Sequence, residues 1–166
     1  MEAIIRPAAK TDAKSLTKIF NQAQRFKLSL GDTAWDTIPY SEEELRKRIA
    51  EGDDYVLLID GDIAGGFQLN WEDKLNWGKQ PPTAGYLHQM AISDRYRGQN
   101  LGALIINWAS NKVLERDRNL LRLDCPPANT KLCNYYKKLG FQEVKTVEIK
   151  TPRHVYSVAL FERRAN

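Results

Sequence analysis

Hydrophobic and polar positions alternate with two different periods along this chain, which predicts an interleaving of strands and helices. Short β-rich runs predict strands at Ile4–Pro7, Tyr55–Ile59, Ile63–Trp71, Gly85–Ile92, Leu120–Cys125, Phe141–Val147 and Val155–Phe161. Apolar residues at helical spacing predict helices that start at Thr11 or Asp12, Ser41, Asn100 and Thr130. The order β-α-α-β-β-β-α-β-α-β-β combines hairpins with βαβ units. It predicts an α/β fold, in which a central mixed sheet is flanked by helices on both faces.

Local capping and turn signals support several of these elements. Ser41–Glu44 has the pattern of a capping box, and Asp60-Gly61 is a tight-hairpin signal. Gly140 follows the helix predicted at Thr130–Leu139, where a left-handed residue commonly closes a helix. Because no repeat, linker or low-complexity segment separates these elements, we expect residues 1–166 to form one domain.

The composition is that of an ordinary soluble domain, with 42% hydrophobic and 28% charged residues. It excludes a disordered or fibrous chain. The apolar run Ala103–Ile106 is far shorter than a membrane span, and the N-terminus lacks the pattern of a signal peptide. Cys125 and Cys133 make no disulfide framework, and we expect both to be buried as small hydrophobic residues. A cytoplasmic protein without a membrane partner is therefore expected.

The charge balance is mildly basic, with 25 Lys and Arg against 21 Asp and Glu and a net charge of +4. Such a balance favours an anionic ligand such as a nucleotide phosphate. The basic residues are scattered, so nucleic-acid binding is the weaker alternative and no nucleic-acid partner is expected. Two histidines are too few for the usual zinc sites, and no metal is expected.

The most informative segment runs from Met90 to Gly102, where a predicted strand passes through a flexible loop into a helix. Backbone N–H groups of such a loop can converge on an anion, and the helix N-terminus adds partial positive charge. Gly98 lets a ligand approach the backbone closely, and Asn100 tolerates the left-handed conformation. The segment matches neither a Walker loop nor a dinucleotide fingerprint. It predicts a pyrophosphate-binding loop, with an ordinary strand–helix turn as the alternative.

A second motif consists of Asn129 and the sequence Tyr136-Lys137-Lys138-Leu139-Gly140-Phe141. Together with Arg97-Gly98-Gln99-Asn100-Leu101-Gly102, it resembles the GNAT superfamily of acetyl-CoA-dependent N-acetyltransferases. The phosphate loop of that family reads R/Q-x-x-G-x-G/A, from which this chain departs by Asn100 in the middle glycine position. The order of elements matches as well, so the resemblance covers nearly the whole chain.

The resemblance implies that acetyl-CoA is the co-substrate and that a primary amine attacks it directly, without an acyl-enzyme. The backbone N–H groups of residues 97–102 would bind the CoA pyrophosphate. Met90 and Ile92 would pair with the pantetheine arm through their backbones, and Asn129 would hydrogen-bond it. Tyr136 would protonate the departing thiolate. The alternative for Tyr136 is core packing, although its neighbour Tyr135 is the expected packing residue.

His88 is the candidate general base, because a histidine can accept a proton at neutral pH. It lies on the same side of its predicted strand as Met90 and Ile92. The position is similar to that of a histidine in aralkylamine N-acetyltransferases. A packed strand histidine is the alternative reading, Glu72 and Asp73 are the alternative bases, and His154 is expected to be structural or exposed.

The resemblance also places the acyl acceptor beside two polar loops, Ser29–Pro39 and Glu72–Pro82. The candidate acceptor residues in or next to them are Trp35, Asp36, Trp71, Glu72 and Asp73. Aromatic rings beside acidic groups suit a cationic amine with an apolar body. The alternative is that the tryptophans, Trp77 above all, only anchor the loops.

These residues predict an N-acetyltransferase that acts on a primary amine of a small molecule. Two alternatives are a non-catalytic sensor of acyl-CoA and a protein N-acetyltransferase. The presence of both Tyr136 and His88 favours an enzyme over a sensor. The sequence leaves the acceptor open, and it leaves both a monomer and a homodimer open.

Overall fold

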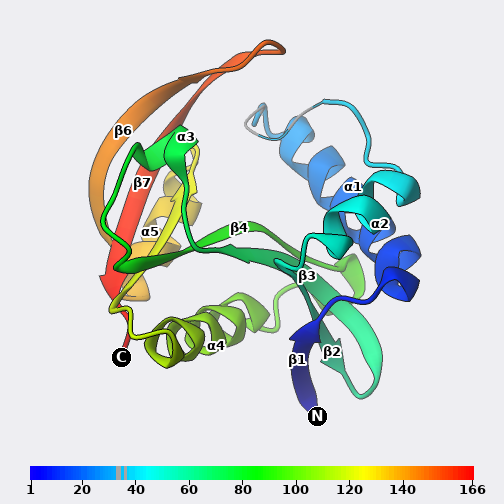
Figure 1. Ribbon diagram of the computed structural model, residues 1–166. Helices are drawn as coiled ribbons and strands as arrows, with labels where there is room; N and C mark the ends of the chain where they lie inside the picture. Colours follow the sequence, from blue (N-terminus) through cyan, green and yellow to red (C-terminus); the bar gives the residue numbers. More distant parts are fainter. Residues whose placement is uncertain (33–34, 36) are drawn as a thin grey trace. The chain divides into compact units, whose positions relative to one another are not determined.

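The computed structural model describes residues 1–32, 35 and 37–166 (Figure 1). Within these residues the hydrogen-bonded strand order is β1-β2-β3-β4-β5-β7-β6. The strands are β1 (Ala3–Pro7), β2 (Asp54–Ile59), β3 (Asp62–Asn70), β4 (Ala84–Ile92), β5 (Leu120–Cys125), β6 (Gln142–Lys150) and β7 (Val155–Arg164). The helices are α1 (Ala13–Ser29), α2 (Glu42–Ala50), α3 (Lys74–Trp77), α4 (Leu101–Glu115) and α5 (Thr130–Lys138). Two short 3₁₀ turns lie at Lys10–Asp12 and Asp94–Tyr96.

The sheet is mixed, which confirms the predicted fold class. β4 and β5 pair in parallel, whereas β1 with β2, β2 with β3, and β7 with both β5 and β6 are antiparallel. The predicted order of strands and helices is confirmed with one addition. The segment Glu72–Pro82, expected to be a polar loop, contains the helix α3, whose N-cap is Asp73. A helix of four residues is too short to produce a periodic pattern in the sequence.

Two of the local signals are realised in detail. The Ser41 hydroxyl accepts a hydrogen bond from the Glu44 N–H at 3.1 Å, and the Glu44 carboxylate accepts one from the Ser41 N–H at 3.0 Å. This is the predicted capping box at the start of α2. Asp60 and Gly61 take φ values of 49° and 87° between β2 and β3, as a tight hairpin requires.

The chain divides into two compact units, and β4 and α4 contribute residues to both. The first unit comprises Met1–Leu69 and Gln89–Trp108, and the second comprises Asn70–His88 and Ala109–Asn166. None of the described helices is both long enough and apolar enough to cross a membrane.

In the first unit, α1 and α2 pack against each other and against the strands (Figure 1). Leu16 and Phe20 of α1 are fully buried in this core. Gly66 of β3 allows the close approach of α1, because a Cβ added there would lie 2.5 Å from Leu16 Cδ2 and 3.3 Å from Phe20 Cζ. Burying a side chain of this kind contributes about 1.5–3 kcal/mol, so Leu16 and Phe20 both stabilise the first unit.

In the second unit, β6 and β7 form a long hairpin that continues the sheet from β5 (Figure 1). One hydrophobic cluster in the core of this unit consists of Trp77, Ala84, Tyr86, Ile149, Val158 and Leu160. Trp77, the last residue of α3, is 6% exposed and packs edge-on against Tyr86. Trp77 therefore anchors the segment before β4, as the structural reading of this residue predicted. Cys125 and Cys133 are both buried, as expected.

Candidate active site

The register of the parallel strands β4 and β5 brings His88 next to Asp124. Tyr86 lies opposite Arg122 in this pairing, and the Tyr86 hydroxyl accepts a hydrogen bond from Arg122 Nη1 at 2.9 Å. Side chains two residues further along each strand return to the same face of the sheet. Those residues are His88 and Asp124, and His88 Nδ1 lies 3.7 Å from Asp124 Oδ2.

The short helix α3 supplies the second carboxylate to this histidine. Asp73 Oδ1 caps the helix by accepting a hydrogen bond from the Asn76 N–H at 3.1 Å, while Asp73 Oδ2 lies 3.1 Å from His88 Nε2. The side-chain amide of Asn76 donates to Asp124 Oδ2 at 3.1 Å. The His88 imidazole is therefore flanked by one carboxylate at each ring nitrogen, and α3 holds both of these carboxylates.

These contacts alter the acidity of His88. Burial of the imidazole opposes its protonation, but the hydrogen bond with Asp73 and the negative charges of Asp124 and Asp73 outweigh this effect. The pKa of His88 is consequently raised above its ordinary value of 6.5. His88 is thus a stronger base than a free histidine.

Tyr136 lies in α5 with its ring in the core of the second unit. It is 6% exposed, and it contacts the rings of Phe141 and Phe161. Burial, with the nearby thiol of Cys125 and carboxylate of Asp124, raises the pKa of the Tyr136 phenol well above its ordinary range. The phenol is therefore neutral at physiological pH, and its role as a proton donor stays a prediction. Tyr135, which the sequence indicated as the packing residue, is only half-buried.

The phenol of Tyr156 in β7 is also affected by the two carboxylates that flank His88. Its ring stacks on His154 with a centroid distance of 4.7 Å. Burial and the negative charges of Asp124 and Asp73 raise the pKa of its phenol. The sequence analysis placed no function on Tyr156, Asn76 or Asp124. The sequence placed Asp124 near the end of an apolar strand, where a carboxylate is unusual. That Asp124 lies next to His88 follows only from the pairing of β4 with β5.

Asp73, His88 and Asp124 are the only group of metal-ligating residues in the described part of the chain whose ligand atoms all lie within 4.8 Å of one another. The expectation that no metal binds stays a prediction.

The predicted pyrophosphate loop lies in the first unit, immediately before the 15-residue helix α4. Gly98 and Asn100 have φ values of 82° and 57°, so the predicted left-handed conformation of Asn100 is confirmed. In the region the structure describes, the N–H groups of Gly98 and Gln99 make no backbone hydrogen bond. Both residues are exposed, so these donors are available to an anion at the helix start.

The residues expected to contact the pantetheine arm are placed as follows. Ala91 is 3% exposed in the core of the first unit, and its neighbours Met90 and Ile92 are half-buried. Because side chains alternate along a strand, Met90 and Ile92 share the face opposite to Ala91. Asn129 is the N-cap of α5, where its side chain accepts a hydrogen bond from the Leu132 N–H at 3.1 Å. The pantetheine contacts themselves stay predictions.

Three of the five predicted acceptor residues lie together in the second unit. Trp71, Glu72 and Asp73 line a cavity of about 440 Å³ around α3. The guanidinium groups of Arg116 and Arg118 lie 4.2 and 5.2 Å from the centroid of the Trp71 ring. Because the protein's own cations already contact this ring, a substrate cation could use it only by displacing them.

The other two predicted acceptor residues come from the first unit. Trp35 packs edge-on against Phe20 and Tyr40, and Lys27 Nζ lies 5.1 Å from the centroid of its ring. Asp36 lies outside the described residues. A substrate contact by either residue stays a prediction.

The mixed sheet and the loop at the start of α4 together define the class of the acetyl-CoA-dependent acetyltransferases. Residues 15–141 match the family model described as the Acetyltransferase (GNAT) family. The chain belongs to this family, which confirms the resemblance found in the sequence.

Individual relatives agree with this assignment. The chain is 26% identical over 144 residues to YesJ of Bacillus subtilis (strain 168), described as an uncharacterized N-acetyltransferase; the match covers 82% of this chain and 79% of YesJ. An acetyltransferase of the GNAT family from Listeria monocytogenes shares the fold with a TM-score of 0.77 and 24% identity, covering 99% of this chain and 95% of the other. The yncA protein of Salmonella typhimurium, solved with its cofactor acetyl-CoA, has a TM-score of 0.74 and 12% identity, with coverages of 100% and 95%.

The charge environment of His88 predicts how its titration responds to substitution. Asp124→Asn and Asp73→Asn each remove a negative charge that favours the imidazolium, so each should lower the pKa of His88 from its raised value. NMR observation of the His88 ring against pH measures the change, with the signal assigned by its loss in His88→Gln. Glu72→Gln is the control, since Glu72 lies on the same segment but pairs with Lys74. A midpoint that is the same in all four proteins would contradict the proposed environment.

Proposed function

We propose that this protein transfers the acetyl group of acetyl-CoA to a primary amine of a small molecule, with His88 as general base. The observation that carries the proposal is the position of the His88 imidazole between Asp73 and Asp124. A histidine that only fills a strand face has no need of two carboxylates. A base that must take a proton from an ammonium ion gains from both.

The geometry supports a definite division of roles. We assign the hydrogen of the neutral imidazole to Nε2, because Asp73 Oδ2 is the nearer carboxylate oxygen, at 3.1 Å from that nitrogen. The lone pair then lies on Nδ1, which takes a proton from the ammonium directly or through a water molecule. Asp124, at 3.7 Å from Nδ1, stabilises the imidazolium that forms. The neutral amine attacks the thioester carbonyl.

The remaining bonds and protons balance as follows. The new C–N bond forms as the C–S bond of the thioester breaks, and the CoA thiolate takes one proton from Tyr136. The nitrogen loses its second proton as the amide forms, and this proton returns to Tyr136 through water. His88 releases the first proton to solvent, so each turnover releases one proton. Burial keeps Tyr136 protonated at neutral pH but also makes the phenol a weaker acid, so its proton moves only as negative charge develops on the sulfur.

Charge distinguishes between the possible acceptors. Asp73 and Asp124 attract an ammonium group and repel a carboxylate, which favours polyamines and arylalkylamines over free amino acids. A protein N-acetyltransferase remains the second candidate, because a peptide N-terminus is also an ammonium without an adjacent carboxylate. A sensor of acyl-CoA is disfavoured, because binding of the cofactor alone requires no base.

The pyrophosphate loop predicts how acetyl-CoA affects thermal stability. Acetyl-CoA should raise the Tm of the wild-type protein, because it binds the folded loop and not the unfolded chain. Gly98→Val should abolish this rise, since a β-branched residue strongly disfavours a φ of 82°. Gly52→Val is the matched control: Gly52 also has positive φ, at 96°, and open space around a Cβ. Both variants should lose some Tm, but only Gly52→Val should keep the rise. A full rise in folded Gly98→Val would disprove the loop assignment.

The activity itself is tested by measuring CoA release from acetyl-CoA over a panel of amines. We expect turnover with spermidine or phenethylamine and lower turnover with amino acids. A peptide with a free N-terminus is included in the panel for comparison. His88→Gln should lower kcat/KM by about 10²–10⁴ at neutral pH, and high pH should partly restore it because the amine then arrives neutral. If no amine in the panel is acetylated, the proposal fails. If the loss in His88→Gln is the same at every pH, His88 is not the base.

The donor role of Tyr136 is tested by a pair of substitutions on one helix. Tyr136→Phe keeps the ring contacts with Phe141 and Phe161 but removes the hydroxyl. It should lower kcat by about 10²-fold, the lower end for general acid catalysis, because CoA thiolate is a fair leaving group. Affinity for acetyl-CoA and Tm should hardly change. Tyr135→Phe is the control and should be mild; equal kcat in both variants would show that Tyr136 only packs.

A further inference from the structure

Gln89 has an unusual backbone for a residue within a strand. Among the described residues, four that are not glycine have positive φ: Asp60, Gln89, Asn100 and Asp117. Three of these are Asp or Asn in turns or loops, where such residues tolerate the left-handed region. Gln89 lies inside β4 with a φ of 49°, and glutamine has no comparable preference. A contact from elsewhere in the structure must therefore hold this conformation.

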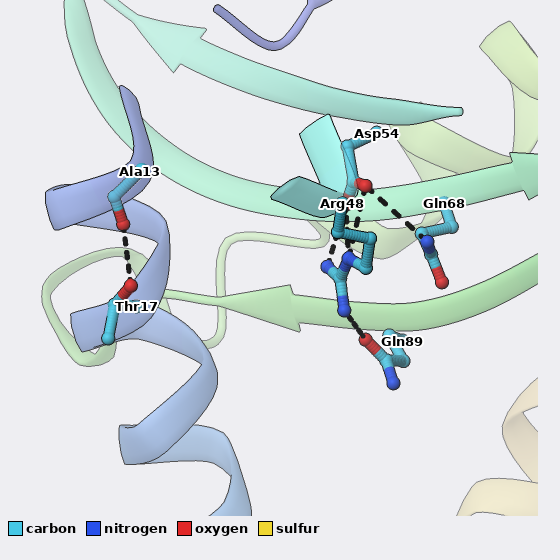
Figure 2. Close-up of polar contacts among 6 residues, drawn as sticks. All are labelled: Ala13, Thr17, Arg48, Asp54, Gln68 and Gln89. Carbon is cyan, nitrogen blue, oxygen red and sulfur yellow. Dashed lines mark hydrogen bonds and ion pairs between the residues drawn. The ribbon is translucent and has the colours of Figure 1, made fainter. Parts of the chain in front are cut away.

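That contact comes from Arg48, as Figure 2 shows. Arg48 Nη1 donates a hydrogen bond to Oε1 of Gln89. The rest of the guanidinium is bound to Asp54, with Nε 3.0 Å from Oδ2 and Nη2 2.6 Å from Oδ1. Its carbon also lies 5.0 Å from the centroid of the Phe20 ring. Arg48 thus reaches Gln89 as a fixed group rather than as a mobile side chain.

The partner of Arg48 is itself firmly anchored. The Asp54 side chain is 1% exposed, and that of Arg48 is 19% exposed. Gln68, which lies opposite Asp54 in the pairing of β2 with β3, donates from Nε2 to Asp54 Oδ2 at 3.4 Å (Figure 2). The ion pair is therefore fixed to the sheet, and through Arg48 it fixes the side chain of Gln89.

We infer that Arg48, held by Asp54, is a positioning residue that keeps the left-handed backbone of Gln89 in β4. Gln89 follows the proposed base His88 and precedes Met90, the residue expected to pair with pantetheine. The φ of residue 89 sets the direction of the peptide groups on its two sides. The expected effect on kcat rests on the proposed function, whereas the expected effect on the φ of residue 89 does not.

Three substitutions at one position separate the backbone from the side chain. Gln89→Ala removes the contact with Arg48, while alanine, like glutamine, adopts a positive φ only at a cost in free energy. Gln89→Gly removes the same contact but makes positive φ free of cost. We expect kcat of Gln89→Ala to fall about 10- to 100-fold, as for a small misplacement of reacting groups, and Gln89→Gly to regain most of this loss. Gln89→Glu keeps an acceptor for Arg48 and should stay close to the wild-type protein. Gln68→Ala is the control and should keep the kcat of the wild-type protein, because it removes a contact with Asp54 and leaves the hydrogen bond between Arg48 and Gln89 in place.

A crystal structure of Gln89→Ala provides the readout that does not depend on activity. The φ of residue 89 should leave the left-handed region in Gln89→Ala and should remain in that region in Gln89→Gly. Equal kcat in Gln89→Ala and the wild-type protein, or equal losses in Gln89→Ala and Gln89→Gly, would overturn the inference. If no amine is acetylated by the wild-type protein, the proposed function fails, and the φ of residue 89 in the Ala variant still decides the positioning role.

Discussion

The parallel pairing of β4 with β5 is the constraint on which the catalytic cluster depends. Two parallel strands cannot be joined by a tight turn, so the chain between them must cross over, and here it does so through α4. The crossover begins with the predicted pyrophosphate loop. The register of the pair then decides that Asp124, and not a neighbour on β5, faces His88. A shift of one residue would turn Asp124 to the other face of the sheet and leave His88 with Asp73 alone.

The sequence predicts those features whose cause is local. The capping box at Ser41, the hairpin at Asp60-Gly61 and the left-handed Asn100 follow from the chemistry of neighbouring residues, and each is present in the structure. His88 could be chosen by residue type and by its position on a strand. Asp124 and Asn76 could not, because their roles arise from a strand register and from a helix of one turn. Neither feature leaves a periodic signal.

The φ angles of Asn100 and Gln89 show the same difference between features that are determined locally and features that are determined by tertiary structure. Asn100 adopts positive φ with help from its own short side chain, whereas Gln89 adopts it against its own preference. A residue held in such a region costs about 1–3 kcal/mol. The guanidinium of Arg48 is held by Asp54, whose side chain is 1% exposed, so Arg48 keeps its position while Gln89 is strained. The conformation at Gln89 is therefore a product of tertiary structure.

In the proposed mechanism, the two carboxylates around His88 have opposing effects on the substrate amine. Negative charge that attracts a substrate ammonium also makes that ammonium harder to deprotonate. The same charge raises the pKa of His88. Since ammonium and imidazolium are both cationic acids in one electrostatic field, the field raises both pKa values and largely preserves the difference between them. In this mechanism Asp73 and Asp124 would strengthen the binding of the amine with little change in the driving force for proton transfer. The cost falls on the free protein, in which His88 must lose its own proton before the amine arrives. The His88 side chain is 23% exposed, so water can reach it and remove that proton in each cycle.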